Sequence, residues 1–238
     1  MSENIKKIMK AFKVDLDSRE NQSIILKPSA RCSFNNQAHQ VNEVAKKIYK
    51  LIEGAKHSND DIILNHNKIK EAFFSPFKPQ LKNAQVFLSH SHADRNKALK
   101  VKNYLESETK HEVFIDSLFW DYKDDVLNEL AKYDDTSKIK DAFVLILRES
   151  LQDMIEKCPY FVFLQSNNSV SNQGLSRTTY SAWIYEELKI ANGLIADTTL
   201  QESRIKAMRV SYDVTNLLMR FKLISLDSLC NEIFSTLS

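Results

Sequence analysis

Residues 86–94 read VFLSHSHAD, and this stretch decides how the chain is expected to fold. The apolar run Val86 to Leu88 leads directly into a polar cluster, which is typical of a buried strand that feeds a loop. From residue 94 to residue 107 the apolar residues recur at helical spacing. A strand, a loop and a helix in this order predict the beginning of a βαβ unit.

The same alternation continues toward the C-terminus. Further strands are predicted at 111–116, 160–164 and 207–212, and further helices at 123–132, 137–157, 181–194 and 214–237. Strands that alternate with helices indicate a parallel sheet, and short apolar strands indicate that both of its faces are covered. The predicted fold class is therefore α/β, a flavodoxin-like doubly wound parallel sheet.

Ligands of doubly wound sheets bind beyond the carboxyl ends of the strands. Three polar or aromatic loops are expected at that edge, namely 89–94, 117–125 and 165–180. Residues 1 to 80 show another pattern, with helical spacing over 3–13, 36–53 and 60–74 before Pro76 and Pro79 interrupt it. We therefore predict a mostly helical N-terminal extension over residues 1–80 and the α/β domain over residues 81–238.

Composition excludes several classes of protein. The 238 residues carry a formal net charge of +2, which favours neither nucleic acid nor a membrane surface as partner. With only 3 glycines, the chain has no GxGxxG or GxxxxGK[ST] loop to bind phosphate. The widely spaced Cys32, Cys158 and Cys230 predict neither a disulfide framework nor a zinc site. Without a signal peptide or a long apolar run, a cytoplasmic protein is the simplest interpretation.

The loop after the first strand, His90 to Asp94, superficially matches the HxHxD ligand pattern of metal-dependent hydrolases. Arg95 follows where that pattern has another histidine, and only His111 lies further downstream, so too few ligands remain. We therefore predict no metal site. A plain loop in which Ser91 or Asp94 caps the next helix is the alternative.

Two aromatic segments complete the candidate site. SLFWDYKDD, residues 117–125, places several aromatic rings on a predicted loop, where they would stack on a planar ligand or fold back onto the core. SAWIYEEL, residues 181–188, spaces Trp183 and Glu187 four apart, on one helical face. Taken alone, that spacing is best explained by an ordinary amphipathic helix.

Taken together and in this order, VFLSHSHAD, EVFIDSLFWDY and CPYFVFLQSNNSVSNQGLSRTTYSAWIYEEL resemble the three conserved segments of the TIR (Toll/interleukin-1 receptor) family. The resemblance covers about residues 84–213. It departs from the family at Ile184, where cysteine is frequent, and at His90 and His92, where other members carry Tyr, Phe or Arg. The N-terminal 80 residues lie outside it.

The resemblance implies an enzyme that cleaves the nicotinamide–ribose bond of NAD⁺, with no permanently bound cofactor. It places the catalytic carboxylate on Glu187. The substrate-binding residues that we expect are Ser89, His90, His92, Asp94, Asp116, Phe119, Trp120, Tyr122 and Trp183. A TIR chain with an added N-terminal region resembles the sensor subunits of Thoeris anti-phage systems, which implies homo-oligomers and a nucleotide messenger read by a separate effector.

Two alternatives remain at this point. One is a non-catalytic TIR adaptor that signals by homotypic assembly, although such an adaptor does not require a glutamate at position 187. The other is a metal-dependent hydrolase that uses His90, His92 and Asp94.

Overall fold

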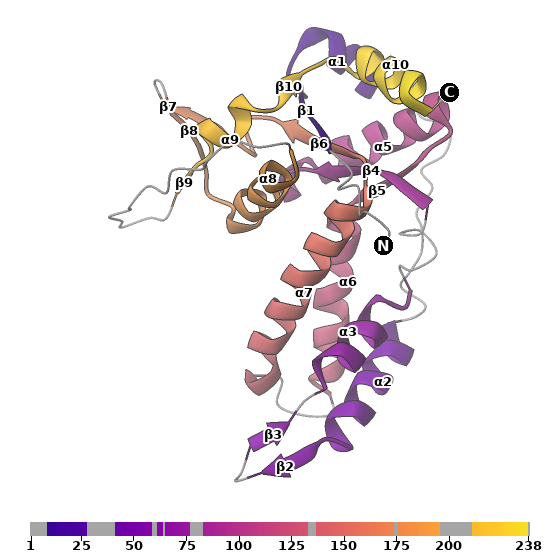
Figure 1. Ribbon diagram of the computed structural model, residues 1–238, viewed down its shortest axis with the longest axis vertical. Helices are drawn as coiled ribbons and strands as arrows, with labels where there is room; N and C mark the ends of the chain where they lie inside the picture. Colours follow the sequence, from indigo (N-terminus) through magenta and orange to yellow (C-terminus); the bar gives the residue numbers. More distant parts are fainter. Residues whose placement is uncertain are drawn as a thin grey trace, which may run out of the picture. The chain divides into compact units, whose positions relative to one another are not determined.

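The computed structural model describes residues 9–27, 41–58, 61–63, 65–76, 83–132, 137–173, 176–195 and 211–237. The chain forms two compact units, coloured along the sequence in Figure 1. Unit 1 consists of Met1–Cys32, Ala84–Asp116 and Met154–Ser238, and unit 2 of Ser33–Asn83 and Ser117–Asp153. Both units are therefore built from segments that are distant in the sequence.

Unit 1 contains a five-stranded sheet in which every pairing is parallel. Its strands are β1 (Lys10–Asp15), β4 (Ala84–Ser89), β5 (Glu112–Ile115), β6 (Tyr160–Gln165) and β10 (Lys222–Leu223). They lie in the order β10-β1-β6-β4-β5. The α/β class and the parallel sheet are thus confirmed, as are the strands expected at 86–88, 111–116 and 160–164.

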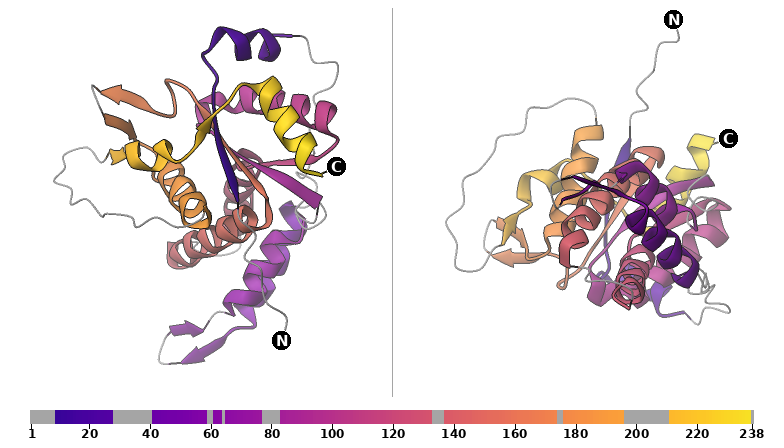
Figure 2. Two further views of the ribbon diagram at one scale, coloured as in Figure 1. Left: turned by 45° about the horizontal axis from the view of Figure 1, so that its top comes forward. Right: turned by 90° about the horizontal axis from the view of Figure 1, so that it is seen from below.

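Helices cover this sheet on both sides. They are α1 (Arg19–Ile25), α5 (Arg95–Thr109), α8 (Ala182–Leu194), α9 (Thr215–Met219) and α10 (Leu226–Leu237), with a short 3-10 helix at His92–Asp94. α5 and α10 pack against each other on one side of the sheet, and α8 lies on the other (Figures 1 and 2). A small antiparallel sheet of β7 (Ser171–Gln173), β8 (Ser176–Thr179) and β9 (Tyr212–Asp213) lies beside α8 and α9.

The middle strands β6 and β4 supply much of the core of unit 1. Residues 160 to 164 of β6 are all buried, as a central strand covered on both faces requires. The Phe87 ring of β4 stacks between its neighbours, 5.6 Å from Phe161 and 5.8 Å from Phe114. These cross-strand aromatic pairs explain why short apolar runs, rather than alternating ones, form this sheet.

The predicted boundary between an N-terminal extension and the main domain is wrong. Residues 10–15, placed in a helix over 3–13, form β1 and pair with β6 along its full length. Phe12 and Val14 are buried in the sheet, while the Lys13 ammonium reaches the Leu218 carbonyl oxygen, 2.9 Å away. The lysine side chains that suggested an amphipathic helix therefore reach polar partners with their charged ends, although the backbone at these residues is an extended strand.

β1 also occupies the position expected for a later strand. In a flavodoxin-like sheet with β4, β5 and β6 as the first three strands, the fourth strand lies beside β6. We predicted that strand at 207–212, of which residues 207–210 lie outside the described part of the chain and Tyr212 belongs to β9. The position beside β6 is filled by β1 instead, so the first strand of the chain takes the fourth place in the sheet.

Unit 2 is mostly helical. It contains α2 (Val41–Glu53), α3 (His66–Phe74), α6 (Ser117–Leu130), most of α7 (Ser137–Lys157) and the hairpin of β2 (Lys56–Ser58) and β3 (Asp61–Ile63). The Phe73 ring lies at the centre of an aromatic cluster, 5.2 Å from Tyr122 and 5.7 Å from Phe143. The helix predicted at 137–157 is thus confirmed, as is the part of the helix predicted at 36–53 that lies in the described residues, 41–53. α2 and most of α7 belong to one unit rather than to two domains.

The loop predicted at 117–125 is absent, because α6 begins at Ser117 directly after β5. Tyr122 and Val126 lie four residues apart on this helix and are both buried. Helical spacing therefore extends through the segment that we had interpreted as an aromatic loop.

The placement of β1 predicts a large effect of Phe12→Ala on stability. Truncation of a buried aromatic side chain costs about 3–5 kcal/mol in free energy of unfolding, and Phe12 is 3% exposed and stacks on Tyr160. Urea denaturation would measure the change. The control is Lys10→Ala in the same strand, because the exposed ion pair of Lys10 with Glu232 is worth less than about 1 kcal/mol. Equal, small effects of the two changes would contradict a central β1.

Candidate functional site

Glu187 lies in the middle of α8 and is fully buried, with an exposed fraction of 0%. Its Oε2 accepts a hydrogen bond from the hydroxyl of Ser89, the last residue of β4. Ninety-eight residues separate these two groups in the sequence. The fold thus brings the glutamate of the third motif to the carboxyl end of the strand in the first motif.

Asp116 adds a second carboxyl group at this place. It directly follows β5, the neighbour of β4, and is 5% exposed. Burial raises the pKa of Glu187 well above its ordinary value, and the negative charge of Asp116 and a hydrogen bond with it raise that pKa further. The hydrogen bond from Ser89 acts in the opposite direction but is the smallest of these effects. Burial and the charge of Asp116 thus both favour the neutral, protonated form of the Glu187 carboxyl group.

His90 extends this buried group on the other side of Asp116. Its Nε2 lies 3.1 Å from Oδ1 of Asp116, and its Nδ1 lies 2.7 Å from the Ser91 carbonyl oxygen. The His90 side chain is 1% exposed. His90, Asp116, Glu187 and Ser89 thus form one buried cluster at the carboxyl ends of β4 and β5, which we call the carboxyl cluster.

Asp94, by contrast, ties loops together. Its carboxylate is 1% exposed and accepts hydrogen bonds from the Ser166 hydroxyl and from Nδ2 of Asn168, the latter at 2.9 Å. The loop after β4 is thereby joined to the loop after β6. Neither Ser91 nor Asp94 caps the following helix through its side chain, so the capping role considered for them is not observed.

The helix that carries Glu187 is held at both ends. Ser181 caps its N-terminus by accepting a hydrogen bond from the Ile184 amide, 3.2 Å away. At the other end the Arg220 guanidinium donates to the carbonyl oxygens of Asn192 and Ile195, at 2.9 and 3.1 Å. Side-chain caps and a cation at the C-terminus both stabilise a helix, so the position of Glu187 is well defined.

The remaining predicted residues are distributed differently. Trp183 lies one helical turn before Glu187 and is partly exposed, while His92 is exposed. Tyr122 belongs to the core of unit 2, where its buried ring packs against Phe73. This position does not support the substrate-binding role predicted for it. Phe119 and Trp120 lie in α6, and their side chains are outside the described part of the structure.

The predicted metal ligands of the rival interpretation do not converge. His90 faces Asp116, Asp94 faces Ser166 and Asn168, and His92 is exposed. Within the described residues, no group of three or more His, Cys, Asp or Glu side chains is placed to hold a metal ion. The HxHxD pattern is therefore divided among different roles in this fold.

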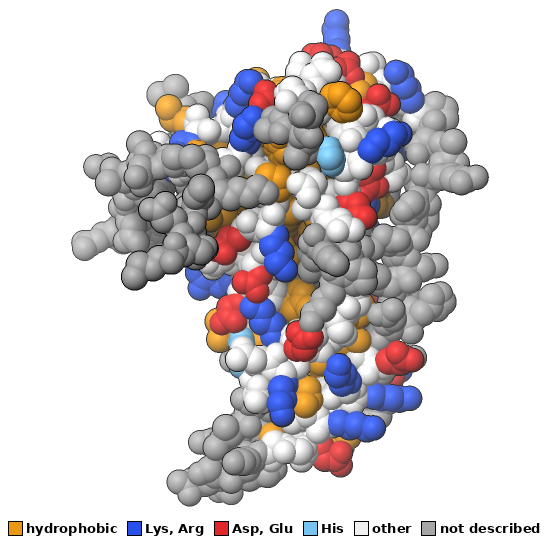
Figure 3. Space-filling model, turned by 45° about the vertical axis from the view of Figure 1, so that its right-hand side comes forward, with side chains coloured by type: hydrophobic (Ala, Val, Ile, Leu, Met, Phe, Trp, Pro, Cys, Tyr) orange, Lys and Arg blue, Asp and Glu red, His pale blue; other side chains and the backbone are white. Residues whose placement is uncertain are grey.

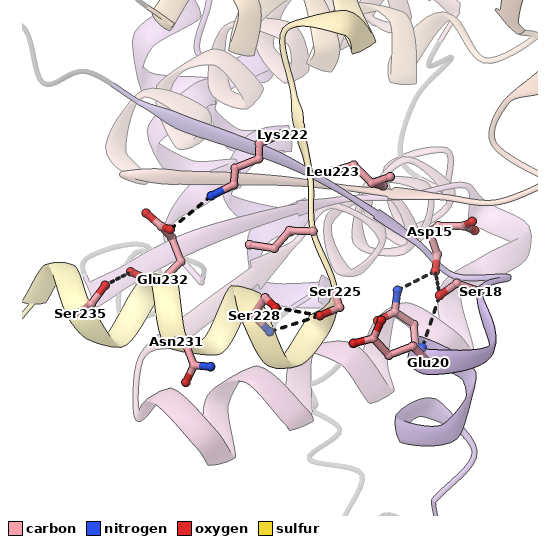
Figure 4. A pocket seen from close by; sticks show the side chains of 12 residues that line it. Asp15, Ser18, Glu20, Lys222, Leu223, Ser225, Ser228, Asn231, Glu232 and Ser235 are labelled. Atoms are coloured by element: carbon pink, nitrogen blue, oxygen red, sulfur yellow. Dashed lines mark hydrogen bonds and ion pairs between the residues drawn. The ribbon is translucent and has the colours of Figure 1, made fainter.

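A groove of about 890 Å³ lies elsewhere on unit 1, at the carboxyl ends of β1 and β10 (Figure 4). Its walls come from the end of β1 and α1 on one side and from α10 on the other, and they are lined mainly by hydroxyl, amide and carboxylate groups. The Lys222 ammonium and the Glu232 carboxylate, 3.6 Å apart, lie at one end. None of the predicted site residues is among its described lining residues, so the groove and the carboxyl cluster are separate features.

Our interpretation of the sequence missed several residues that support the site. Ser166 and Asn168 follow β6 directly, in a polar loop that we expected at the ligand edge, but nothing in the sequence connects them with Asp94. Arg220 and Asn192 are distant from each other in the sequence, and their contact gives no local signal. The position of Asp17, which accepts a hydrogen bond from the Asn167 amide at 3.1 Å, depends on β1 and was missed with it.

Comparisons of the chain with protein-family models, with curated proteins and with solved structures gave no match. The assignment of function therefore depends on the residues and their geometry. Acidic and basic side chains are interspersed over the face drawn in Figure 3, with no large area of one sign. Within the described residues, no helix has the length and apolar character needed to cross a membrane.

The buried carboxyl of Glu187 predicts a stability that depends on pH. Because folding raises the pKa of Glu187, this group lowers the free energy of unfolding as pH rises above the ordinary value of about 4.3. Each tenfold gain in proton affinity corresponds to about 1.4 kcal/mol. We expect Glu187→Gln, which stays neutral, to be more stable than the wild type at pH 7–8, with the difference shrinking toward pH about 4.

Urea midpoints at several pH values would measure this difference. Glu186→Gln is the matched control, because Glu186 precedes Glu187 on the same helix but is partly exposed. The raised pKa of Glu187 would be contradicted if the gain in free energy of unfolding of Glu187→Gln over the wild type did not grow between pH 5 and pH 8.

Proposed function

We propose that this protein is a TIR-type enzyme that cleaves the bond between nicotinamide and ribose in NAD⁺, with Glu187 as the catalytic carboxylate. One observation carries the proposal. Ser89 of VFLSHSHAD, Asp116 of EVFID and Glu187 of SAWIYEEL, which come from three separate motifs, meet at the carboxyl ends of β4 and β5. Ligands of doubly wound sheets bind at this edge, and perturbed carboxyl groups are common at catalytic sites.

The chemistry suits a single ionised carboxylate. The bond from C1′ of the ribose to the nicotinamide nitrogen breaks, and its electron pair leaves with nicotinamide, which becomes neutral. No general acid is required, unlike the paired carboxylates of ordinary glycoside hydrolysis. The Glu187 carboxylate would stabilise the positive charge that develops on the ribose. Water would then attack C1′ and give ADP-ribose and a proton, or an adenine nitrogen would attack and give a cyclic isomer.

The raised pKa of Glu187 is compatible with this role. A neutral carboxyl group does not stabilise a cation, but an opposite charge within about 4–6 Å favours the ionised form. The positive nicotinamide ring would therefore promote loss of the Glu187 proton. Partly exposed Trp183, one turn away on α8, would offer a planar surface for one of the rings of the substrate.

Access to Glu187 requires a movement. Its side chain has no exposed surface, so NAD⁺ would reach it only after the groups that cover it are displaced. Such a closed resting state fits an enzyme that is activated on demand. The resemblance to Thoeris sensor subunits supports a cytoplasmic role in anti-phage immunity, in which homo-oligomers release an ADP-ribose-derived messenger to a separate effector.

Nicotinamide release from NAD⁺, followed by chromatography at low and high protein concentration, tests the proposal. We expect Glu187→Gln to lower the rate about 10²–10³-fold, the usual effect of removing one electrostatic stabiliser of a transition state. Glu186→Gln should retain activity and thus controls for changes on the same helix. Release that is unaffected by Glu187→Gln would refute the catalytic role, whereas no release from assembled protein would favour the TIR adaptor.

A further inference from the structure

The carboxyl cluster contains three polar atoms that the described structure leaves without a hydrogen-bond partner. They are Nε2 of His90, Oδ1 of Asp116 and Oε1 of Glu187. All three are buried, and buried polar atoms in native proteins are almost always paired. Nε2 and Oδ1 lie 3.1 Å apart, so these two atoms are partners of each other once a proton lies between them. Asp116 is in turn the charged group that acts on Glu187.

The protons can be counted from the geometry. A carbonyl oxygen only accepts hydrogen bonds, so Nδ1 of His90, 2.7 Å from the Ser91 carbonyl oxygen, carries a hydrogen. In neutral imidazole Nε2 would then hold a lone pair facing an oxygen of Asp116, which is repulsive without a further proton. One proton therefore lies between His90 and Asp116. On Glu187, burial and the negative charge of Asp116 favour a second proton, because two buried carboxyl groups that act on each other are not readily both ionised.

We propose that His90, Asp116 and Glu187 form one proton-sharing unit, in which the His90 imidazolium holds the negative charge on Asp116 and the proton stays on Glu187. His90 is a positioning residue in this unit, since it acts on Glu187 only through Asp116. When the substrate cation binds, Glu187 loses its proton to solvent. The positive charge of the nicotinamide ring then balances the negative charge of the Glu187 carboxylate. This last step rests on the proposed function, whereas the proton-sharing unit exists in the free protein.

The groups that face Glu187 make the proposal specific. The Ser89 hydroxyl, from β4, donates to one of its oxygens, and Asp116, from the end of β5, is the charged group that acts on it. His90 is the group that faces Asp116. Removing the negative charge of Asp116 should therefore make Glu187 easier to ionise, and removing the imidazolium should make it harder. These opposite directions distinguish proton sharing from a merely structural role.

The test is a titration of the Glu187 carboxyl carbon by NMR in protein labelled with ¹³C-glutamate and free of NAD⁺. The Glu187 resonance is the one that disappears in Glu187→Gln. We expect Asp116→Asn to lower the midpoint of its titration and His90→Gln to raise it, each by about one pH unit or more, the usual effect of a neighbouring charge. His92→Gln, an exposed histidine in the same loop, should leave the midpoint unchanged.

The proposal would be overturned if Asp116→Asn and His90→Gln moved the Glu187 midpoint in the same direction. It would also be overturned if His90→Gln left that midpoint unchanged. Asp116→Ser replaces Asp116→Asn if the latter does not fold.

A separate measurement links the unit to catalysis: the pH profile of nicotinamide release should move to lower pH in Asp116→Asn and to higher pH in His90→Gln. Because the titration needs no substrate, it decides on proton sharing even if the chain never cleaves NAD⁺.

Discussion

The parallel pairing of β1 with β6 is the interaction on which the rest of unit 1 depends. Six consecutive residue pairs, from Lys10 with Tyr160 to Asp15 with Gln165, join the first segment of the chain to its middle. β10 pairs only with β1 in this sheet, so the last strand is attached through the first. With β4 on its other side, β6 is thereby covered along both edges, which allows all of its apolar residues to be buried.

A second constraint is the burial of ionisable groups at the edge of that sheet. Burying a carboxyl group away from water is costly unless it is neutral or well paired. Here the cost is limited because Ser89 donates to Glu187 and His90 faces Asp116. A core assembled for stability alone would place apolar side chains at these positions. Residues that lower stability but remain in a defined geometry are typical of sites that serve a function.

The sequence allowed most of the sheet to be predicted. Strands β4, β5 and β6 are short apolar runs that end in polar residues, and this signal is local. β1 is a different case, since Lys10 and Lys13 interrupt its apolar residues and gave a pattern compatible with a helix. Only the tertiary structure supplies their partners, Glu232 and the Leu218 carbonyl. β10, two residues long, has no pattern at all and exists because β1 offers it an edge.

In the candidate site, too, some residues could be predicted from the sequence and others could not. Ser89, Asp116 and Glu187 could be selected because the three segments that carry them resemble those of one family, whereas the spacing around Glu187 alone indicates only an amphipathic helix. The fold brings all three residues together. The aromatic residues after β5 were misplaced, because a helix with Tyr122 on its buried face has the same composition as an aromatic loop. The contacts that hold the site, such as Asp94 with Ser166 and Arg220 with Asn192, join distant positions and leave no trace in either segment.

The distribution of these contacts also indicates which part of the site can open. α8 is fixed by the Ser181 cap at one end and by the hydrogen bonds from Arg220 at the other. In addition, the Asn192 side chain donates to the carbonyl oxygens of both Leu188 and Leu217. The loop after β4 is anchored at Asp94, but His92 and Ala93 within it are exposed. Segments with few buried contacts open at the lowest free energy. The exposed residues His92 and Ala93 are therefore displaced more easily than the helix, and an opening there would carry the neighbouring His90 away from Asp116. Admission of a ligand and the loss of the imidazolium that faces Asp116 would then be the same event, which links the proton on Glu187 to the state of the loop.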